Sequence, residues 1–161
     1  MTDSTGSRII ATLIARGQTI AVAESLTGGL LVAELIGTPG ASAVVLGGIV
    51  AYRTELKHTV LGVSGELLAK EGAVHPDVAA QMATGVRAAL AVAGAPAVIG
   101  ISTTGVAGPE PQDGQPVGTV YLGFAIGDVV HTTRLMLTGG REEIRRAAVD
   151  LSLTELERLL G

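Results

Sequence analysis

The sequence predicts an α/β fold, a three-layer α/β/α sandwich around a mixed, mostly parallel sheet that includes one antiparallel hairpin. Segments with the helical spacing of apolar residues alternate with short β-branched and alanine-rich runs typical of buried strands. Further along, a two-residue turn joins two more strand-like runs. The chain has 161 residues, enough for one domain with a substantial core, so we expect residues 1–161 to form a single domain.

Predicted helices and strands alternate in the N-terminal half. Apolar positions recur every three or four residues over 5–16, which predicts an amphipathic helix. Residues 19–23 are typical of a buried strand, and residues 30–36 follow as a helix. Residues 43–52 predict a second buried strand, in which two adjacent glycines indicate a bulge or a close approach by another element. A short helix is expected in the polar stretch 54–58.

The C-terminal half continues the alternation and adds the hairpin. Proline in the first turn and apolar residues at helical spacing predict a helix over 76–94. Residues 97–102 predict a third buried strand. Val120, Leu122 and Phe124 alternate as in a strand, Gly127 and Asp128 suit a two-residue turn, and residues 129–137 supply the partner, which predicts two antiparallel strands. A long amphipathic helix is expected over 141–160.

Composition excludes several classes of protein. Apolar residues make up 47% and charged residues 16%, which indicates a compact chain. No apolar run approaches the roughly 20 residues of a membrane span, so we expect no membrane partner. The net charge is −4 and basic residues are scattered, which argues against nucleic-acid binding. Without cysteine or a signal-peptide pattern, a cytoplasmic location is the expectation.

The first candidate site is the turn that follows residues 19–23. Ser25 stands between a predicted strand end and a helix start, where free backbone N–H groups favour a nucleophile or an anion. The alternative is that Ser25 or Thr27 caps the helix and that Gly28 and Gly29 only permit a tight turn. This stretch alone favours the capping role.

A second group of hydroxyls and small residues follows the third strand. Thr103, Thr104 and Gly105 open a predicted turn that suits a phosphate, a carbonyl oxyanion, or no ligand at all. In α/β sheets the carboxyl ends of neighbouring strands meet in one crevice. The two turns are therefore expected to build one site.

A serine nucleophile requires a base. His58, His75 and His131 match no Ser-His-Asp or metal-ligand spacing, so each is expected to be a surface or structural residue. Lys57 could serve as the base if burial lowered the pKa of its amine, although a solvated surface lysine is the default.

A basic group begins the last predicted helix. Arg141, Arg145 and Arg146 could clamp a phosphate behind a pair of glycines. Salt bridges to Glu142 or Glu143 are an equally good account of this group.

Six motifs then occur in a familiar order: AESLTGG, GGIVAYRTELKHTVLGV, GAVHPDVAAQMA, TTGVAGP, PVGTVYLG and GGREEIRRAAV. In this order and over nearly the whole chain the sequence resembles the CinA C-terminal domain family of competence/damage-inducible proteins, in a stand-alone domain form. That family includes bacterial nicotinamide-nucleotide amidohydrolases. The resemblance implies hydrolysis of the carboxamide of nicotinamide mononucleotide to nicotinate mononucleotide and ammonia, in pyridine nucleotide salvage, with no cofactor or metal.

Roles follow from the matched positions. The resemblance implies that Ser25 is the nucleophile, that Lys57 is its general base, and that Tyr52 helps to orient the pair or the substrate. Thr104 and the Gly105 backbone would stabilise the oxyanion, and Arg141 would bind the phosphate. The full set of implied substrate-binding residues is Thr27, Gly28, Gly29, Gly105, Val106, Ala107, Gly108 and Arg141.

This sequence departs from the family pattern at four places. Leu26 replaces a common cysteine, Thr54 a common asparagine, and Gly140 a common aspartate, while residues 110–113 replace a glycine-rich stretch. These departures support an alternative, a non-catalytic nucleotide-binding or regulatory module, and a purely structural domain is a third possibility. The resemblance also implies a homo-oligomer, a dimer or larger. Glu24 could bond backbone groups or Lys57, and its role stays open.

Overall fold

The computed structural model describes residues 4–161. Helices and strands follow one another in the order that the sequence predicts, with one 3₁₀ turn and one short α-helix added. The elements are α1 (Thr5–Arg16), β1 (Ile20–Glu24), α2 (Leu30–Ile36), the 3₁₀ turn η1 (Ala41–Ala43), β2 (Val45–Val50), α3 (Thr54–Thr59), α4 (Gly65–Glu71), α5 (Pro76–Ala89), β3 (Ile99–Gly105), β4 (Thr119–Ile126), β5 (Val129–Met136) and α6 (Arg141–Leu160).

All strands belong to one sheet with the order β2-β1-β3-β4-β5. β1 pairs in parallel with β2 and with β3, whereas β4 pairs antiparallel with β3 and with β5. Only β4 therefore runs against the other strands of the sheet, which confirms a mixed, mostly parallel sheet with one hairpin.

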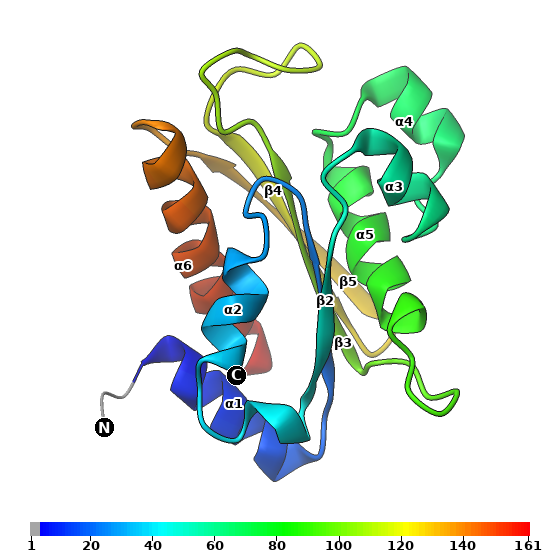
Figure 1. Ribbon diagram of the computed structural model, residues 1–161, viewed down its shortest axis with the longest axis vertical. Coiled ribbons are helices and arrows are strands. Elements are labelled where there is room, and N and C mark those ends of the chain that lie inside the picture. Colours follow the sequence, from blue (N-terminus) through cyan, green and yellow to red (C-terminus); the bar gives the residue numbers. More distant parts are fainter. Residues whose placement is uncertain (1–3) are drawn as a thin grey trace.

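Helices cover both faces of this sheet. In Figure 1, α1, α2 and α6 lie on one side of the sheet and α3, α4 and α5 on the other. The first face packs a large core that includes Ile9, Leu35, Phe124 and Leu156. The second face packs a smaller core against α5, around Met82. The predicted three-layer sandwich is confirmed.

The glycine pair in the second strand has the predicted cause. A Cβ on Gly48 would lie 2.9 Å from Cβ of Val32, so α2 packs directly on the β2 backbone. The pairing of β1 with β2 also shifts register between Ile20 and Ala21. Both a bulge and a close approach are present.

Three expectations about individual elements are corrected. The second strand is not buried: β2 is an edge strand, hydrogen-bonded on one side only, and Val50 is 44% exposed. The third strand continues to Gly105 because its pairing with β4 extends to Val120, so Thr103 and Thr104 lie in the strand and not in a turn. The helix expected over 76–94 ends at Ala89, ahead of a tight turn.

The helix α4 was not predicted, although the sequence contains a capping residue for it. The side-chain hydroxyl of Ser64 accepts a hydrogen bond from Leu67 N and so caps α4. Among residues 4–161, none of the helices combines the length and the apolar character that crossing a bilayer requires.

Candidate active site

The carboxyl ends of β1, β2 and β3 meet at one edge of the sheet and enclose a cavity of about 380 Å³. This volume lies within the range of about 300–1,000 Å³ that small-molecule sites occupy. The lining comes from the ends of these strands, the α4–α5 connection, the loop after β3 and the start of α6: Ser25, Leu26, Tyr52, Arg53, Thr54, Glu55, Ala73, Val74, Thr104, Gly105, Val106, Ala107, Gly108, Glu110, Gln112 and Arg141. The prediction that two separate segments build one crevice is confirmed.

Ser25 and Lys57 are in direct contact at the base of this cavity. Nζ of Lys57 donates a hydrogen bond to Oγ of Ser25 at 3.1 Å and a second one to the carbonyl oxygen of Ala51 at 2.8 Å. Lys57 comes from the short helix α3, is 1% exposed, and lies behind the serine. The hydrogen bond to Ala51 fixes the orientation of the amine, and a second hydrogen-bonding direction of the same nitrogen points to the serine hydroxyl.

Burial changes the acidity of this lysine. Loss of solvent around the ammonium lowers the pKa of Lys57 from 10.5 to about 8, although the carboxylates of Asp113 and Glu55 act in the opposite direction. At pH 7 about one lysine in ten is then a neutral amine, against fewer than about one in a thousand for an unperturbed side chain. The structure thus places a potential base beside a potential nucleophile.

Glu24 occupies the N-terminus of α2. Its fully buried carboxylate accepts hydrogen bonds from the backbone N–H groups of Gly29, Leu31 and Val32 at 3.0, 3.0 and 2.9 Å. The anion at this helix start is therefore the chain's own Glu24 carboxylate, and these donors are not available to a ligand. The expectation that Ser25 or Thr27 caps the helix is wrong, because neither hydroxyl bonds the N–H groups of α2 and Glu24 caps it instead. The question about Glu24 is answered in favour of backbone contacts, since the bonds of the Lys57 amine go to Ser25 and Ala51.

The other residues of the turn after β1 have structural contacts. Thr27 is fully buried, and its hydroxyl shares a hydrogen bond of 2.8 Å with the hydroxyl of Thr103. Neither Thr27 nor Gly28 and Gly29, which were expected to bind substrate, belongs to the cavity lining. This part of the turn therefore lies outside the cavity, and Thr27 ties it to β3.

Thr104 and Gly105 lie side by side in β3 but face different neighbours. The hydroxyl of Thr104 donates its proton to the carbonyl of Ala73 at 2.7 Å. This proton is therefore not available to an oxyanion, which is contrary to the role that the resemblance implied for Thr104. Ser25 N donates to the carbonyl of Thr103 at 3.1 Å, so the backbone groups of Thr103 face β1. In a strand the backbone groups of residues i and i+2 face the same neighbouring strand, and Gly105 is two residues after Thr103. The N–H of Gly105 is therefore directed toward β1, on the side of Ser25.

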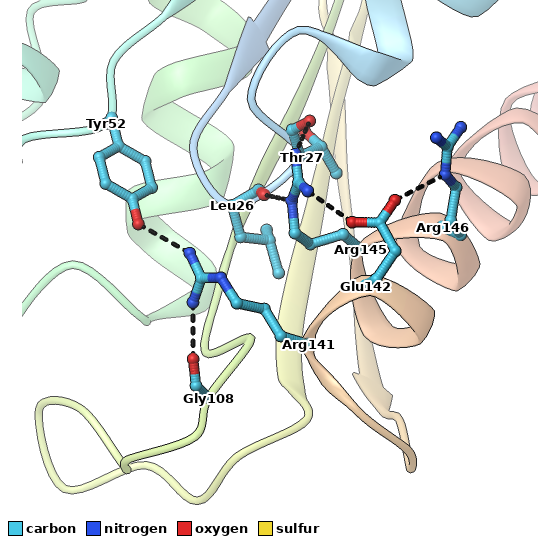
Figure 2. A network of polar contacts seen from close by, with 8 residues as sticks. All are labelled: Leu26, Thr27, Tyr52, Gly108, Arg141, Glu142, Arg145 and Arg146. Carbon is cyan, nitrogen blue, oxygen red and sulfur yellow. Dashed lines mark hydrogen bonds and ion pairs between the residues drawn. The ribbon is translucent and has the colours of Figure 1, made fainter.

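Arg141 joins two walls of the cavity. Its guanidinium donates to the carbonyl of Gly108 at 2.6 Å and to the hydroxyl of Tyr52 at 3.0 Å (Figure 2). Tyr52 is 58% exposed, and its hydroxyl bonds Arg141 and not the Ser25–Lys57 pair, which the resemblance suggested as one of its roles. Tyr52 and Arg141 thus share the cavity rim.

Arg145 does not face the cavity as a phosphate ligand but bonds the turn after β1. Its guanidinium donates to the carbonyls of Leu26 at 2.8 Å and Thr27 at 3.4 Å, in the turn that carries Ser25 (Figure 2). Glu142 bonds both Arg145 and Arg146, so the salt bridges of the alternative account are present as well. Arg145 therefore ties α6 to the nucleophile turn.

Replacing Arg145 by alanine should destabilise the fold by about 1–2 kcal/mol, because the two carbonyls lose a charged donor. Arg146→Ala is the matched control, since it breaks a contact to the same Glu142 but none to the turn. Its effect should stay within about 0.5 kcal/mol. Urea denaturation of both variants measures the difference, and equal losses would contradict the role of Arg145.

The histidines have structural or surface positions, as expected. His75 caps α5 by accepting a hydrogen bond from Asp77 N, and His58 bonds the carbonyl of Val63. His131 lies exposed on β5. Within residues 4–161 no group of three His, Cys, Asp or Glu side chains is placed to hold a metal ion.

The family model for the CinA C-terminal domain matches residues 2–160. The chain belongs to the CinA C-terminal domain family. It is 48% identical over 159 residues to a CinA-like protein of Frankia casuarinae, a match that covers 99% of this chain and 36% of that protein. A CinA-like protein of Gemmatimonas aurantiaca is 41% identical over 159 residues, which cover 97% of this chain and 36% of that protein. The chain thus spans about a third of the length of these curated relatives.

Solved structures of the CinA family share both fold and extent. A CinA superfamily protein from Enterobacter cloacae superposes with a TM-score of 0.90 at 32% identity, covering 98% of this chain and 90% of that one. The competence/damage inducible protein CihA from Agrobacterium tumefaciens gives a TM-score of 0.89 at 36% identity, covering 98% and 94%. The fold described here for this CinA-family chain therefore extends over most of the length of these solved chains.

Proposed function

We propose that this CinA-family chain is an amidohydrolase that converts nicotinamide mononucleotide to nicotinate mononucleotide and ammonia. The observation that carries the proposal is the 3.1 Å contact between Oγ of Ser25 and Nζ of a buried Lys57 at the base of the cavity. A carboxamide is a suitable target because its carbonyl carbon is open to attack by an activated hydroxyl.

The residues account for each proton in two steps. The neutral amine of Lys57 accepts the proton of Ser25 as Oγ bonds to the carboxamide carbon, and the resulting ammonium protonates the departing nitrogen. Ammonia leaves and an ester of Ser25 remains. Lys57 then takes a proton from water, whose oxygen attacks the ester carbon, and returns it to Oγ of Ser25 as the acid is released.

Charge that develops on the carboxamide oxygen requires donors on the opposite wall. The N–H of Gly105 is directed toward the side of Ser25 and replaces the Thr104 hydroxyl in this role. Loss of one such donor typically costs about 3 kcal/mol of barrier. At the rim, Arg141 uses two of the five N–H donors of a guanidinium in its contacts to Gly108 and Tyr52, which leaves others for a phosphate.

The direct test is ammonia release from nicotinamide mononucleotide by the purified chain. We expect turnover, and weaker turnover of nicotinamide riboside, which lacks the phosphate that Arg141 would bind. Ser25→Ala should bind the nucleotide in calorimetry without releasing ammonia. Binding by the unchanged chain without any ammonia release would instead favour the non-catalytic nucleotide-binding module.

The acidity of Lys57 predicts the pH dependence of this activity. Only the neutral amine accepts the serine proton, so kcat/KM should rise tenfold per pH unit below about pH 8 and level off above it. Initial rates at subsaturating substrate between pH 5.5 and 9.5 measure this profile, with unfolding monitored in parallel. A flat profile between pH 6 and 8 would contradict Lys57 as the base.

A further inference from the structure

The loop between β3 and β4 is built as a small rigid hairpin. Gln112 and Gln115 exchange two backbone hydrogen bonds of 3.1 and 2.8 Å, and the two residues between them, Asp113 and Gly114, have φ values of 51° and 73°. Left-handed φ at both central positions is the signature of a type I′ turn, for which Asp-Gly is a preferred sequence. Gln112 and Asp113, which belong to the stretch where the sequence departs from the family pattern, therefore form part of a defined turn.

The tip of this hairpin is attached to the segment between α4 and α5. Oδ2 of Asp113 accepts a hydrogen bond from the backbone N–H of Ala73 at 2.9 Å. Gly72 makes room for it: a Cβ there would lie 2.5 Å from Cγ of Asp113, and its φ of +76° also favours glycine. In Figure 1 the yellow-green loop reaches from the ends of β3 and β4 toward this segment.

The peptide groups of Ala73 are held from two directions. Its N–H bonds Asp113, and its carbonyl accepts the hydroxyl proton of Thr104 at 2.7 Å. Ala73 is 2% exposed and lines the cavity together with Glu110 and Gln112 of the loop. At the other end of the loop, Arg141 holds the carbonyl of Gly108. The loop is thus fastened near its start at Gly108 and at its tip at Asp113, with the cavity-lining Glu110 and Gln112 between the two attachments.

We propose that Asp113 is a positioning residue whose bond to the Ala73 amide holds the loop of residues 106–118 across the cavity, so that Glu110 and Gln112 form one wall of the substrate site. The loop, rather than the sheet, then determines how tightly a substrate is held. The kinetic part of this inference rests on the proposed amidohydrolase function, whereas the attachment itself does not.

The carboxylate has a second effect at the base of the cavity. Asp113 and Glu55 are the negative groups that raise the pKa of Lys57 against the larger, opposite effect of burial. Removal of the Asp113 charge should therefore lower the pKa of Lys57 further. The attachment and the charge can be separated, because asparagine keeps an oxygen for the Ala73 N–H but carries no charge.

The experiment compares Asp113→Ala, Asp113→Asn and Asp128→Asn. Asp128 lies at the tip of the β4–β5 hairpin, so its variant changes the net charge equally at a turn that does not line the cavity. Hydrogen exchange at the Ala73 amide reports the attachment without any substrate. We expect at least about fivefold faster exchange in Asp113→Ala and exchange close to that of the unchanged chain in the other two.

Kinetics with nicotinamide mononucleotide provide the second readout. Asp113→Ala should raise KM about tenfold with kcat changed less than about threefold, which corresponds to one lost hydrogen bond of about 1.4 kcal/mol. Asp113→Asn should retain KM and move the acidic limb of kcat/KM to lower pH.

Unchanged Ala73 exchange in Asp113→Ala would overturn the attachment, whether or not the chain is active. Altered exchange with an unchanged KM would overturn the role of the loop in substrate binding, and absence of turnover in every variant would count against the proposed function alone.

Discussion

Lys57→Met should abolish ammonia release and at the same time stabilise the fold. Methionine has a similar length and fills the buried space behind Ser25, but its thioether sulfur is too weakly basic to take the serine proton. We expect a loss of at least about 10³-fold in kcat, because removing either member of a nucleophile–base pair disables the whole pair. Ser25→Ala should be as inactive, and the double variant no worse than either single one.

The stability gain follows from the lowered pKa. Holding the ammonium in the interior costs about 3 kcal/mol at pH 7, because the pKa of Lys57 falls from 10.5 to about 8 on folding. Lys57→Met removes this cost, and we expect a gain of about 1–3 kcal/mol that is full below pH 8. It should shrink between pH 8 and pH 10.5 and vanish above that range, where the unchanged lysine is neutral in the unfolded chain as well as in the folded one.

Urea denaturation at pH 7 and pH 10, with ammonia assays on the same samples, tests both effects. Lys70→Met is the matched control, because the Lys70 side chain on α4 is 79% exposed and outside the cavity lining. It should leave activity and stability nearly unchanged. Residual activity above about 1% in Lys57→Met would contradict its role as the base, and a loss of stability would contradict a cost of burial.

Glu24→Ala should be the most destabilising of the variants considered. Three backbone N–H groups at the start of α2 lose their acceptor, and two of them belong to the partly buried Gly29 and Val32. Each unsatisfied group costs about 1–3 kcal/mol, so we expect a loss of about 3–5 kcal/mol in the free energy of unfolding. Glu24→Gln, which keeps one acceptor oxygen, should lose less.

Glu34→Ala on the exposed side of the same helix is the control and should change stability by less than about 0.5 kcal/mol. Thermal unfolding measured by circular dichroism distinguishes the variants. Activity should fall with Glu24→Ala even below its melting temperature, since Ser25 is the next residue. A loss of under about 1 kcal/mol in Glu24→Ala would show that water or another group satisfies these donors.

Local pattern was sufficient for most of the fold because periodicity reports which faces of an element are buried. The helix over Thr5–Arg16 and the hairpin turn at Gly127 lie where the sequence placed them. The edge position of β2 could not be predicted in this way. An apolar run in an edge strand and one in a central strand look alike, and only the order of strands distinguishes them.

At the site, pattern and resemblance together were enough to name Ser25, Lys57 and Arg141, because reactive side chains that follow a strand or begin a helix can be recognised within one segment. The hydrogen-bond partner of each polar group could be known only from the folded chain. Glu24 satisfies α2, Thr104 is committed to Ala73, Arg145 holds the nucleophile turn, and Asp113 attaches a loop. The physical reason is that a hydrogen bond depends on distances of a few tenths of an ångström between segments far apart in the chain, whereas burial periodicity is set by the residues of one segment.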